Sequence, residues 1–255
     1  MASFLDARAH GGRWLLRIED IDPPREVAGA SNQIIAALGA FGFVWDGAIE
    51  FQSRRSEHYQ SAFETLLAQG HVYGCVCSRK EIGEQVYPGT CRNGIAADAQ
   101  PRAYRVRVSN ENIVWQDRLA GESVEPLARS SGDFVIKRAD GLWAYQLAVV
   151  VDDALQGVNH VVRGDDLKDS SARQIYLQQL LALPRPDYLH VPVVRAADGQ
   201  KLSKQTGARA LDGRQALSEL RQAAFHLQLG LINAESLTEF WSAASHAWSQ
   251  RYLLR

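Results

Sequence analysis

Two lysines in the segment KLSK, Lys201 and Lys204, are the residues best suited to bind phosphate. They come after an apolar segment and the turn Ala-Asp-Gly-Gln, so we expect them on a loop after a strand. Two ammonium groups on such a loop can bind a polyphosphate and neutralise the charge on a departing pyrophosphate. The pattern also occurs by chance on many surfaces, and a solvated loop is the simpler interpretation when it is taken alone.

Two other charged groups also come after apolar segments. Arg163 lies in RGDD at the end of an expected strand, the edge at which open α/β sheets bind ligands. Its guanidinium could hold a carboxylate through two hydrogen bonds, although a structural Arg–Asp pair explains the pattern equally well. Glu19 lies in RIEDIDPPRE after another expected strand. A carboxylate there suits an ammonium group, and a solvated acidic turn is the alternative.

Three cysteines, Cys75, Cys77 and Cys91, lie within one short window. Clustered cysteines outside a secreted disulfide framework are typical of metal or redox chemistry. Structural zinc requires four donors, so one position remains to be filled. Tyr87, four residues before Cys91, could fill it as a phenolate, and His71 is the more ordinary candidate. Buried thiols with one incidental cysteine are the alternative.

The composition indicates a protein with an ordinary apolar core. The 255 residues suffice for one large domain or two small ones. No apolar run approaches the roughly 20 residues that a membrane span needs, and the polar start shows no signal peptide. We therefore expect a cytoplasmic protein. The formal net charge of -1 provides no overall attraction to nucleic acid, so any RNA contact must use local patches.

One such patch is the segment 191–225, where basic residues outnumber acidic ones. Patches of this kind bind phosphates with a strong dependence on salt. A mixed, solvated helical face is the alternative interpretation. The basic residues are Arg195, Lys201, Lys204, Arg209, Arg214 and Arg221, against Asp198, Asp212 and Glu219.

The elements that must position these residues alternate between strands and helices. Helical periodicity is clear in the face formed by Ala172, Tyr176, Leu180 and Leu183, which separates two apolar segments. This alternation predicts an α/β fold with a parallel sheet. The first ten residues resemble the end of a helix, and the chain beyond residue 205 is expected to be helical. Expected strands cover 13–18, 103–108, 134–138, 159–164 and 190–194.

Four segments together resemble a known family in their order and spacing: RIEDIDPPRE, YGCVCSRKEI…YPGTCR, DGLWAYQLAVVVDDALQGVNHVVRGDDL and KLSKQ. This family is the glutamyl-tRNA synthetase group of class I aminoacyl-tRNA synthetases, and the resemblance covers nearly the whole chain. It implies a Rossmann-like parallel sheet, a zinc-containing α+β insertion and a helical C-terminal region. The implied boundaries are 1–73 with 132–204 for the catalytic domain, 74–131 for the insertion and 205–255 for the helical region.

The resemblance also implies a reaction. The enzyme would activate glutamate with ATP and Mg²⁺, without tRNA, to form glutamyl-adenylate. The match is closest to the short branch without an anticodon-binding domain. That branch transfers glutamate to queuosine at the wobble position of tRNA(Asp), and we expect it to act as a monomer, with no DNA or membrane partner. The implied residues are Glu19, Tyr145 and Arg163 for glutamate, Lys204 for ATP, Lys201 and Lys204 for catalysis, and Cys75, Cys77, Tyr87 and Cys91 for one structural zinc.

The resemblance begins late in the family pattern. Family members start with a strand, an RFAPS-like glutamate-binding segment and a HIGH-like motif, and SFLDARAHGGRW resembles the family segment that comes after this motif. We therefore expect the chain as written to lack its first strand and to activate glutamate poorly. Either the true start lies upstream or the chain is truncated. The alternatives in function are a fragment of a glutamyl-tRNA synthetase and a catalytically impaired zinc- and RNA-binding remnant.

Overall fold

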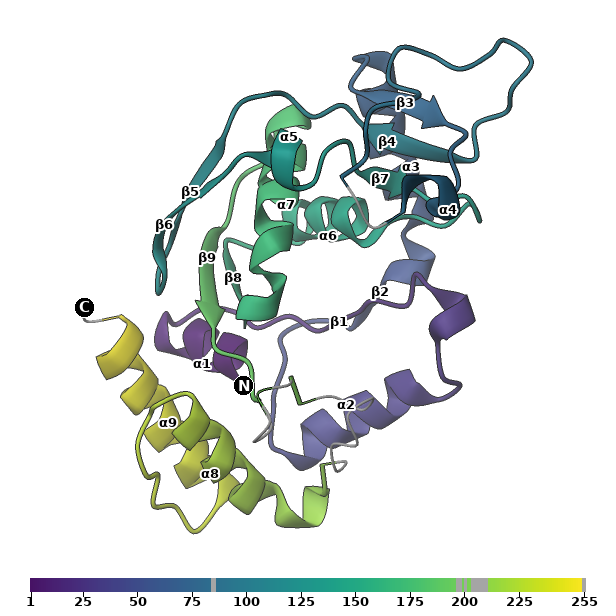
Figure 1. Cartoon of the computed structure of the whole chain (residues 1–255). Coiled ribbons are helices and arrows are strands. Elements are labelled where there is room, and N and C mark those ends of the chain that lie inside the picture. Colours follow the sequence, from purple (N-terminus) through teal and green to yellow (C-terminus); the bar gives the residue numbers. More distant parts are fainter. Residues whose placement is uncertain (84–85, 196–198, 200, 203–210, 254–255) are drawn as a thin grey trace.

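Helices and strands alternate along the chain in this computed structural model (Figure 1). It describes residues 1–83, 86–195, 199, 201–202 and 211–253. The strands are β1 (Arg17–Ile18), β2 (Glu50–Phe51), β3 (Val72–Cys75), β4 (Ala103–Val106), β5 (Ile113–Asp117), β6 (Gly121–Glu125), β7 (Val135–Lys137), β8 (His160–Gly164) and β9 (Asp187–Val191). The helices are α1 (Ala2–Ala9), α2 (Ala30–Ala40), α3 (Ser56–Ala68), α4 (Arg79–Ile82), α5 (Leu127–Ser130), α6 (Tyr145–Leu155), α7 (Lys168–Leu180), α8 (Ala216–His226) and α9 (Leu237–Tyr252).

The largest described sheet has the strand order β6-β5-β9-β8. Strands β5, β9 and β8 are parallel, and β6 joins β5 as an antiparallel hairpin. Helix α7 connects β8 to β9 and packs against α6, so β8, α7 and β9 form the βαβ unit that the periodicity predicts. The sheet as a whole is mixed rather than purely parallel. Strand β8 is half-buried because it lies at the edge of this sheet.

A second sheet has the order β3-β4-β7 and is antiparallel. It carries Cys75 at the end of β3 and leads through a turn into α6. The segment 74–131 thus contributes to two sheets, since β4 pairs with β3 and β7 while β5 pairs with β9. The strand expected over 13–18 is shorter than predicted. Only Arg17 and Ile18 form β1, which pairs in parallel with β2.

The apolar core has two main parts. One lies between α3, α6, α7 and the strands, and buries Tyr59, Leu147 and Ile175. The other joins α1 to the C-terminal helices α8 and α9 around Phe240 and Trp248, and these helices lie below the sheets in Figure 1. The C-terminal region is therefore helical where the structure describes it. None of the described helices combines the length and apolarity that crossing a membrane would require.

Candidate active site

Glu19, Tyr145 and Arg163 come from distant parts of the chain and line one cavity of about 920 Å³. Glu19 lies just after β1, Tyr145 is the first residue of α6, and Arg163 lies on β8. The cavity separates the segment 12–17 from the segment 156–163. Strand ends and a helix start deliver these side chains to a shared space, as expected for the ligand-binding edge of an α/β sheet.

The three side chains influence one another electrostatically. Burial raises the pKa of Tyr145, and the negative charge of Glu19 raises it further, while Arg163 opposes the increase. Burial also raises the pKa of Glu19, against the opposing effect of Arg17. Tyr145 is consequently a neutral phenol that can donate or accept a hydrogen bond. The cavity thus presents a carboxyl group, a phenol and a guanidinium, which are complementary to an amino acid with an ammonium and carboxylates.

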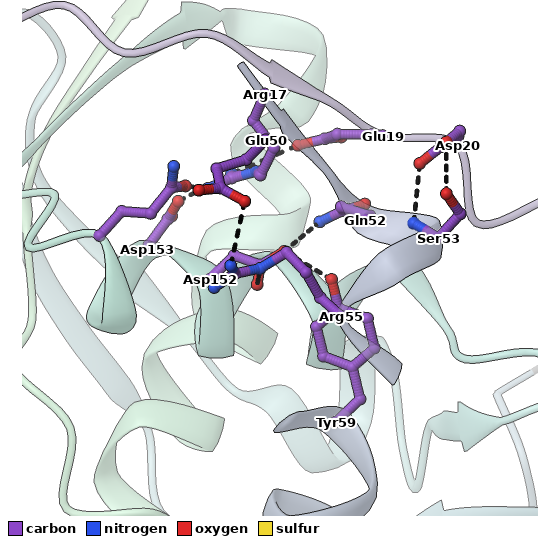
Figure 2. A network of polar contacts seen from close by, with 11 residues as sticks. Arg17, Glu19, Asp20, Glu50, Gln52, Ser53, Arg55, Tyr59, Asp152 and Asp153 are labelled. Atoms are coloured by element: carbon purple, nitrogen blue, oxygen red, sulfur yellow. Dashed lines mark hydrogen bonds and ion pairs between the residues drawn. The ribbon is translucent and has the colours of Figure 1, made fainter. Parts of the chain in front are cut away.

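Arg17 connects Glu19 to helix α6, as Figure 2 shows. Its guanidinium donates hydrogen bonds to Asp153 at 2.8 Å, Gln156 at 2.6 Å and Glu19 at 3.3 Å. The Arg17 side chain is only 14% exposed, whereas that of Glu19 is 38% exposed. Helix α6 therefore holds Tyr145 directly and restrains Glu19 through Asp153, Gln156 and Arg17.

Asp152, the neighbour of Asp153, is fully buried and has a separate set of partners, which lie to its right in Figure 2. Its carboxylate accepts hydrogen bonds from Gln52 at 2.8 Å, Arg55 at 2.6 Å and Tyr59 at 2.6 Å. These partners come from the segment after β2 and from the start of α3. Consecutive aspartates on α6 thus tie it both to the cavity wall and to the packed core.

Arg163 is held on three sides. It donates from Nε to His190 at 3.1 Å, from Nη1 to Gln174 at 2.8 Å and from Nη2 to Ser171 at 2.9 Å. An arginine has five N–H donors. Within the described part of the chain, these contacts leave one N–H on each terminal nitrogen for a ligand. Such a fixed planar group is suited to a carboxylate.

A second cavity, of about 800 Å³, lies on the other side of Glu19 and Tyr145. Asp22 in its wall pairs with Arg25 and Arg138, whose contacts lower the pKa of Asp22. Its lining also includes Cys77, so it lies between the candidate amino acid site and the cysteines. Basic side chains dominate it, namely Arg25, Arg79, Arg102, Arg105 and Arg138.

The lysine loop is described only in part. Lys201 forms an ion pair with Asp166 of the RGDD sequence, so the loop lies beside the end of β8. Lys204 lies outside the described residues. In the basic segment 191–225, Arg214 pairs with Asp212, and Arg195 donates to the carbonyl of Gly199. Lys204, Arg209 and Asp198 of that segment are also outside the described residues.

The sulfurs of Cys75, Cys77 and Cys91 lie within 4.8 Å of one another. The Tyr87 hydroxyl joins them, since it lies 3.4 Å from the Cys75 sulfur and 3.7 Å from the Cys77 sulfur. Among the described residues, His71 is not part of this metal-binding group. The fourth neighbour of the thiols is thus the phenol.

The donor set fits a tetrahedral ion. The Cys77 and Cys91 sulfurs are 3.5 Å apart. Two thiolates bound to tetrahedral zinc are separated by about 3.8 Å, from Zn–S bonds of about 2.3 Å. Burial opposes ionisation of Cys91, but hydrogen bonds from the backbone of Val76 and from its neighbours lower its pKa to about 7. Arg105 donates a hydrogen bond to the Cys75 sulfur at 3.3 Å.

The fold is that of a class I glutamyl-tRNA synthetase. A glutamate tRNA ligase from Elizabethkingia meningosepticum superposes with a TM-score of 0.74 at 21% identity, covering 94% of this chain and 59% of that one. A glutamate-tRNA synthetase from Elizabethkingia anophelis gives 0.76 at 20% identity, covering 100% and 66%. At these identities the similarity establishes the fold alone.

The sequence comparisons establish the family. Residues 1–243 match the family described as tRNA synthetases class I (E and Q), catalytic domain. The glutamyl-Q tRNA(Asp) synthetase of Verminephrobacter eiseniae is 52% identical over 268 aligned positions, covering 99% of this chain and 91% of that protein. The protein of that name from Janthinobacterium sp. is also 52% identical, covering 99% and 90%. The chain belongs to this family of class I aminoacyl-tRNA synthetases, which are ligases.

Several residues of the site are not apparent from the sequence patterns. The contribution of Arg17 depends on Asp153, which is 136 positions away in the chain. The sequence does contain a signal for Asp152 and Asp153, which follow the apolar part of a helix. Two aspartates there are costly to bury without partners, so their presence indicates hydrogen-bonding partners elsewhere in the chain. His190 reads as part of an apolar strand, and only the fold shows that it contacts Arg163.

Proposed function

We propose that this chain activates glutamate with ATP and transfers it to queuosine at the wobble position of tRNA(Asp). The observation that carries the proposal is the convergence of Glu19, Tyr145 and Arg163 on one cavity. The names of the relatives at 52% identity support the acceptor. The proposed catalytic domain comprises 1–73 and 132–204, with an insertion at 74–131 and a helical region at 205–255.

The cavity suits glutamate in charge and in arrangement. The ammonium of the ligand would bind Glu19, and the side-chain carboxylate of glutamate would bind the two remaining N–H groups of Arg163. The phenol of Tyr145 is close enough to both groups for the charge of Glu19 to raise its pKa and the charge of Arg163 to lower it. Binding the ammonium would also favour the ionised form of Glu19, whose pKa the surrounding protein raises.

Activation would join an oxygen of the α-carboxylate of glutamate to the α-phosphorus of ATP and release pyrophosphate. Such a reaction depends mainly on positioning and on neutralising the developing charge. We propose Lys201 and Lys204 for the phosphate charge, with Mg²⁺ on the nucleotide. The ion pair between Lys201 and Asp166 brings Lys201 close to the end of the strand that carries Arg163, which supports the assignment of this lysine.

The cavity lined by arginines supports an RNA acceptor beside the glutamate. Of its arginines, Arg25, Arg105 and Arg138 contact other groups of the protein, which leaves Arg79 and Arg102 as the better candidates to bind phosphate groups. The wall of this cavity shares Glu19 and Tyr145 with the amino acid cavity. An acceptor nucleotide entering there would meet the activated carboxyl group. We also propose that Cys75, Cys77, Tyr87 and Cys91 hold one zinc ion that stabilises the wall next to this cavity, without taking part in the chemistry.

Two measurements on the purified chain test the proposal. Calorimetry should detect binding of L-glutamate and much weaker binding of L-glutamine, because the amide lacks the charge that Arg163 would bind. Exchange of labelled pyrophosphate into ATP should require glutamate and should proceed without tRNA. Binding is measured separately because exchange also needs the complete ATP site. Equal binding of the two amino acids would contradict the amino acid site.

The acceptor is tested with two RNAs. Glutamate should be attached to tRNA(Asp) that contains queuosine and not to the same tRNA with guanosine at that position. Charging of tRNA(Glu) instead would favour a glutamyl-tRNA synthetase fragment. If the chain binds tRNA but shows no attachment of glutamate and no glutamate-dependent exchange, the zinc- and RNA-binding remnant would be favoured.

A further inference from the structure

A buried carboxylate and a buried imidazole lie directly behind Arg163. Asp117 is 1% exposed and His190 is 3% exposed, and neither lines the cavity. Burying an ionisable pair is costly unless each member is fully hydrogen-bonded. The contacts of this pair lead across the sheet to Arg163, which suggests a role in holding that side chain.

The three residues form a row across neighbouring parallel strands. Asp117 lies on β5, His190 on β9 and Arg163 on β8, and His190 is paired in register with Arg163. The Asp117 carboxylate lies 2.6 Å from Nδ1 of His190, and Nε2 of His190 accepts from Arg163 at 3.1 Å. Helix α7 adds Ser171, which is fully buried and contacts both Arg163 and His190.

The hydrogen bonds determine the tautomer of His190. The Nε–H of Arg163 can only donate, so Nε2 of His190 must be an acceptor. The proton of the neutral imidazole therefore lies on Nδ1 and is donated to Asp117. Ser171 agrees with this assignment, because its hydroxyl accepts from Arg163 and can donate to Nε2.

Asp117 is itself fixed by the backbone. One carboxylate oxygen accepts from the N–H groups of Leu119 and Ala120, at 3.0 Å and 2.8 Å. The other accepts from both the N–H and the ring of His190. Burial raises the pKa of Asp117, but these hydrogen bonds outweigh the effect and lower it overall. The carboxylate is therefore ionised and immobile at neutral pH.

We propose that Asp117 and His190 are positioning residues that fix the plane and orientation of the Arg163 guanidinium for the carboxylate of the amino acid substrate. The inference rests on the proposed function of Arg163. Ser171 and Gln174 hold the two terminal nitrogens, and His190 holds Nε, which prevents rotation of the group. A guanidinium held in this way loses little conformational freedom when the ligand binds.

Two substitutions of His190 separate its contacts. In His190→Gln, the amide oxygen can occupy the position of Nε2 and accept from Arg163. In His190→Asn, the shorter amide can occupy the position of Nδ1 and donate to Asp117, but it offers Arg163 no acceptor. His190→Asn should raise the Kd and KM for glutamate roughly 2- to 10-fold, the range for a side chain that must be ordered when the ligand binds. His190→Gln should remain close to the unmodified protein.

Asp117→Asn provides an independent variant that leaves His190 in place. The two backbone N–H groups would orient the new amide oxygen toward themselves and its NH₂ group toward the imidazole. His190 would then place its proton on Nε2, where it opposes the Nε–H of Arg163. We expect Asp117→Asn to raise the KM for glutamate as His190→Asn does. His246→Asn, an exposed histidine on α9 that contacts Gln250, is the matched control.

Calorimetry with glutamate, pyrophosphate exchange and ¹⁵N NMR of the Arg163 Nε–H are measured on all variants. The KM for ATP should not change, and the slowly exchanging Arg163 Nε–H signal should disappear in His190→Asn and persist in His190→Gln. Equal behaviour of the two His190 variants would overturn the inference, whether both are impaired or neither. Failure of the unmodified protein to bind glutamate would instead overturn the proposed function, while the NMR signal would still report on the positioning of Arg163.

Discussion

Replacement of Asp152 by alanine tests the buried network that holds α6. The substitution removes the acceptor for Gln52, Arg55 and Tyr59, two of which are fully buried. Each buried donor left without a partner costs about 1–3 kcal/mol, although Arg55 keeps a contact to Glu50. We expect a total destabilisation of about 3–5 kcal/mol, the range for removing one partner of a buried ion pair.

The assay is urea and thermal unfolding followed by circular dichroism. For a chain of this size, about 1 kcal/mol corresponds to 2–4 °C, so Asp152→Ala should lower Tm by roughly 6–20 °C. Tyr59→Phe removes one of the three hydrogen bonds and should cost about 1 kcal/mol. Asp98→Ala, in an exposed loop, should leave Tm nearly unchanged. A change of less than about 1 kcal/mol for Asp152→Ala would refute the reasoning, since a lost surface charge costs no more than that.

Three further predictions concern other parts of the molecule. The affinity for the glutamate ligand should fall on acidification, because protonation of Glu19 removes the charge that binds the ammonium group. This fall should begin at a higher pH than for a glutamate side chain with an unshifted pKa, because the folded protein raises the pKa of Glu19. Calorimetry at several pH values should show a flatter profile for Glu19→Gln. Zinc chelation should lower Tm, and Cys91→Ser should lower both Tm and the bound metal measured by mass spectrometry. Arg118→Ala should destabilise the fold by about 3–5 kcal/mol, because it removes the arginine that donates two hydrogen bonds to the buried carboxylate of Asp6. Burial opposes ionisation of Asp6, but hydrogen bonds from Arg118 and Trp248 lower its pKa overall. The stabilisation by this carboxylate should therefore be present at neutral pH and lost as the pH falls below the usual range for aspartate. Urea titrations at several pH values would show whether the difference in stability between Arg118→Ala and the unmodified protein disappears over that range.

Local patterns predict the elements well and their partners poorly. The apolar face of α7 and the segment that becomes β8 are visible in the sequence because their periodicity reflects burial. Strand β9 (Asp187–Val191) overlaps the strand expected over 190–194 only at its end. The short length of β1 is not visible, because RWLLRI has the composition of a longer strand and only its pairing with Glu50 and Phe51 sets its limits. Likewise, no local signal shows that β5 joins β9, since strand order depends on contacts between distant segments.

The candidate site divides in the same way. Charged residues just after apolar segments predicted Glu19 and Arg163 as candidates, because the ends of parallel strands are where ligands bind. Tyr145 had no such signal, and only the resemblance to a family indicated it. The supporting residues Asp153 and His190 were missed because each contributes a hydrogen bond to a residue far away in the chain, 136 positions for Asp153 and 27 for His190. A pattern of residue types does not encode such pairs.

Helix α6 connects the buried network to the residues that line the candidate site. Tyr145 begins the helix at the cavity, and Asp153, two turns later, holds Arg17 and through it Glu19. Asp152 anchors the same turn to α3 and the segment after β2. A movement of α6 would therefore shift the phenol and the carboxylate relative to Arg163, which lies on β8. Because a displacement of about 1 Å is enough to reduce catalysis strongly, we expect the buried network around Asp152 to help preserve the geometry of the candidate site.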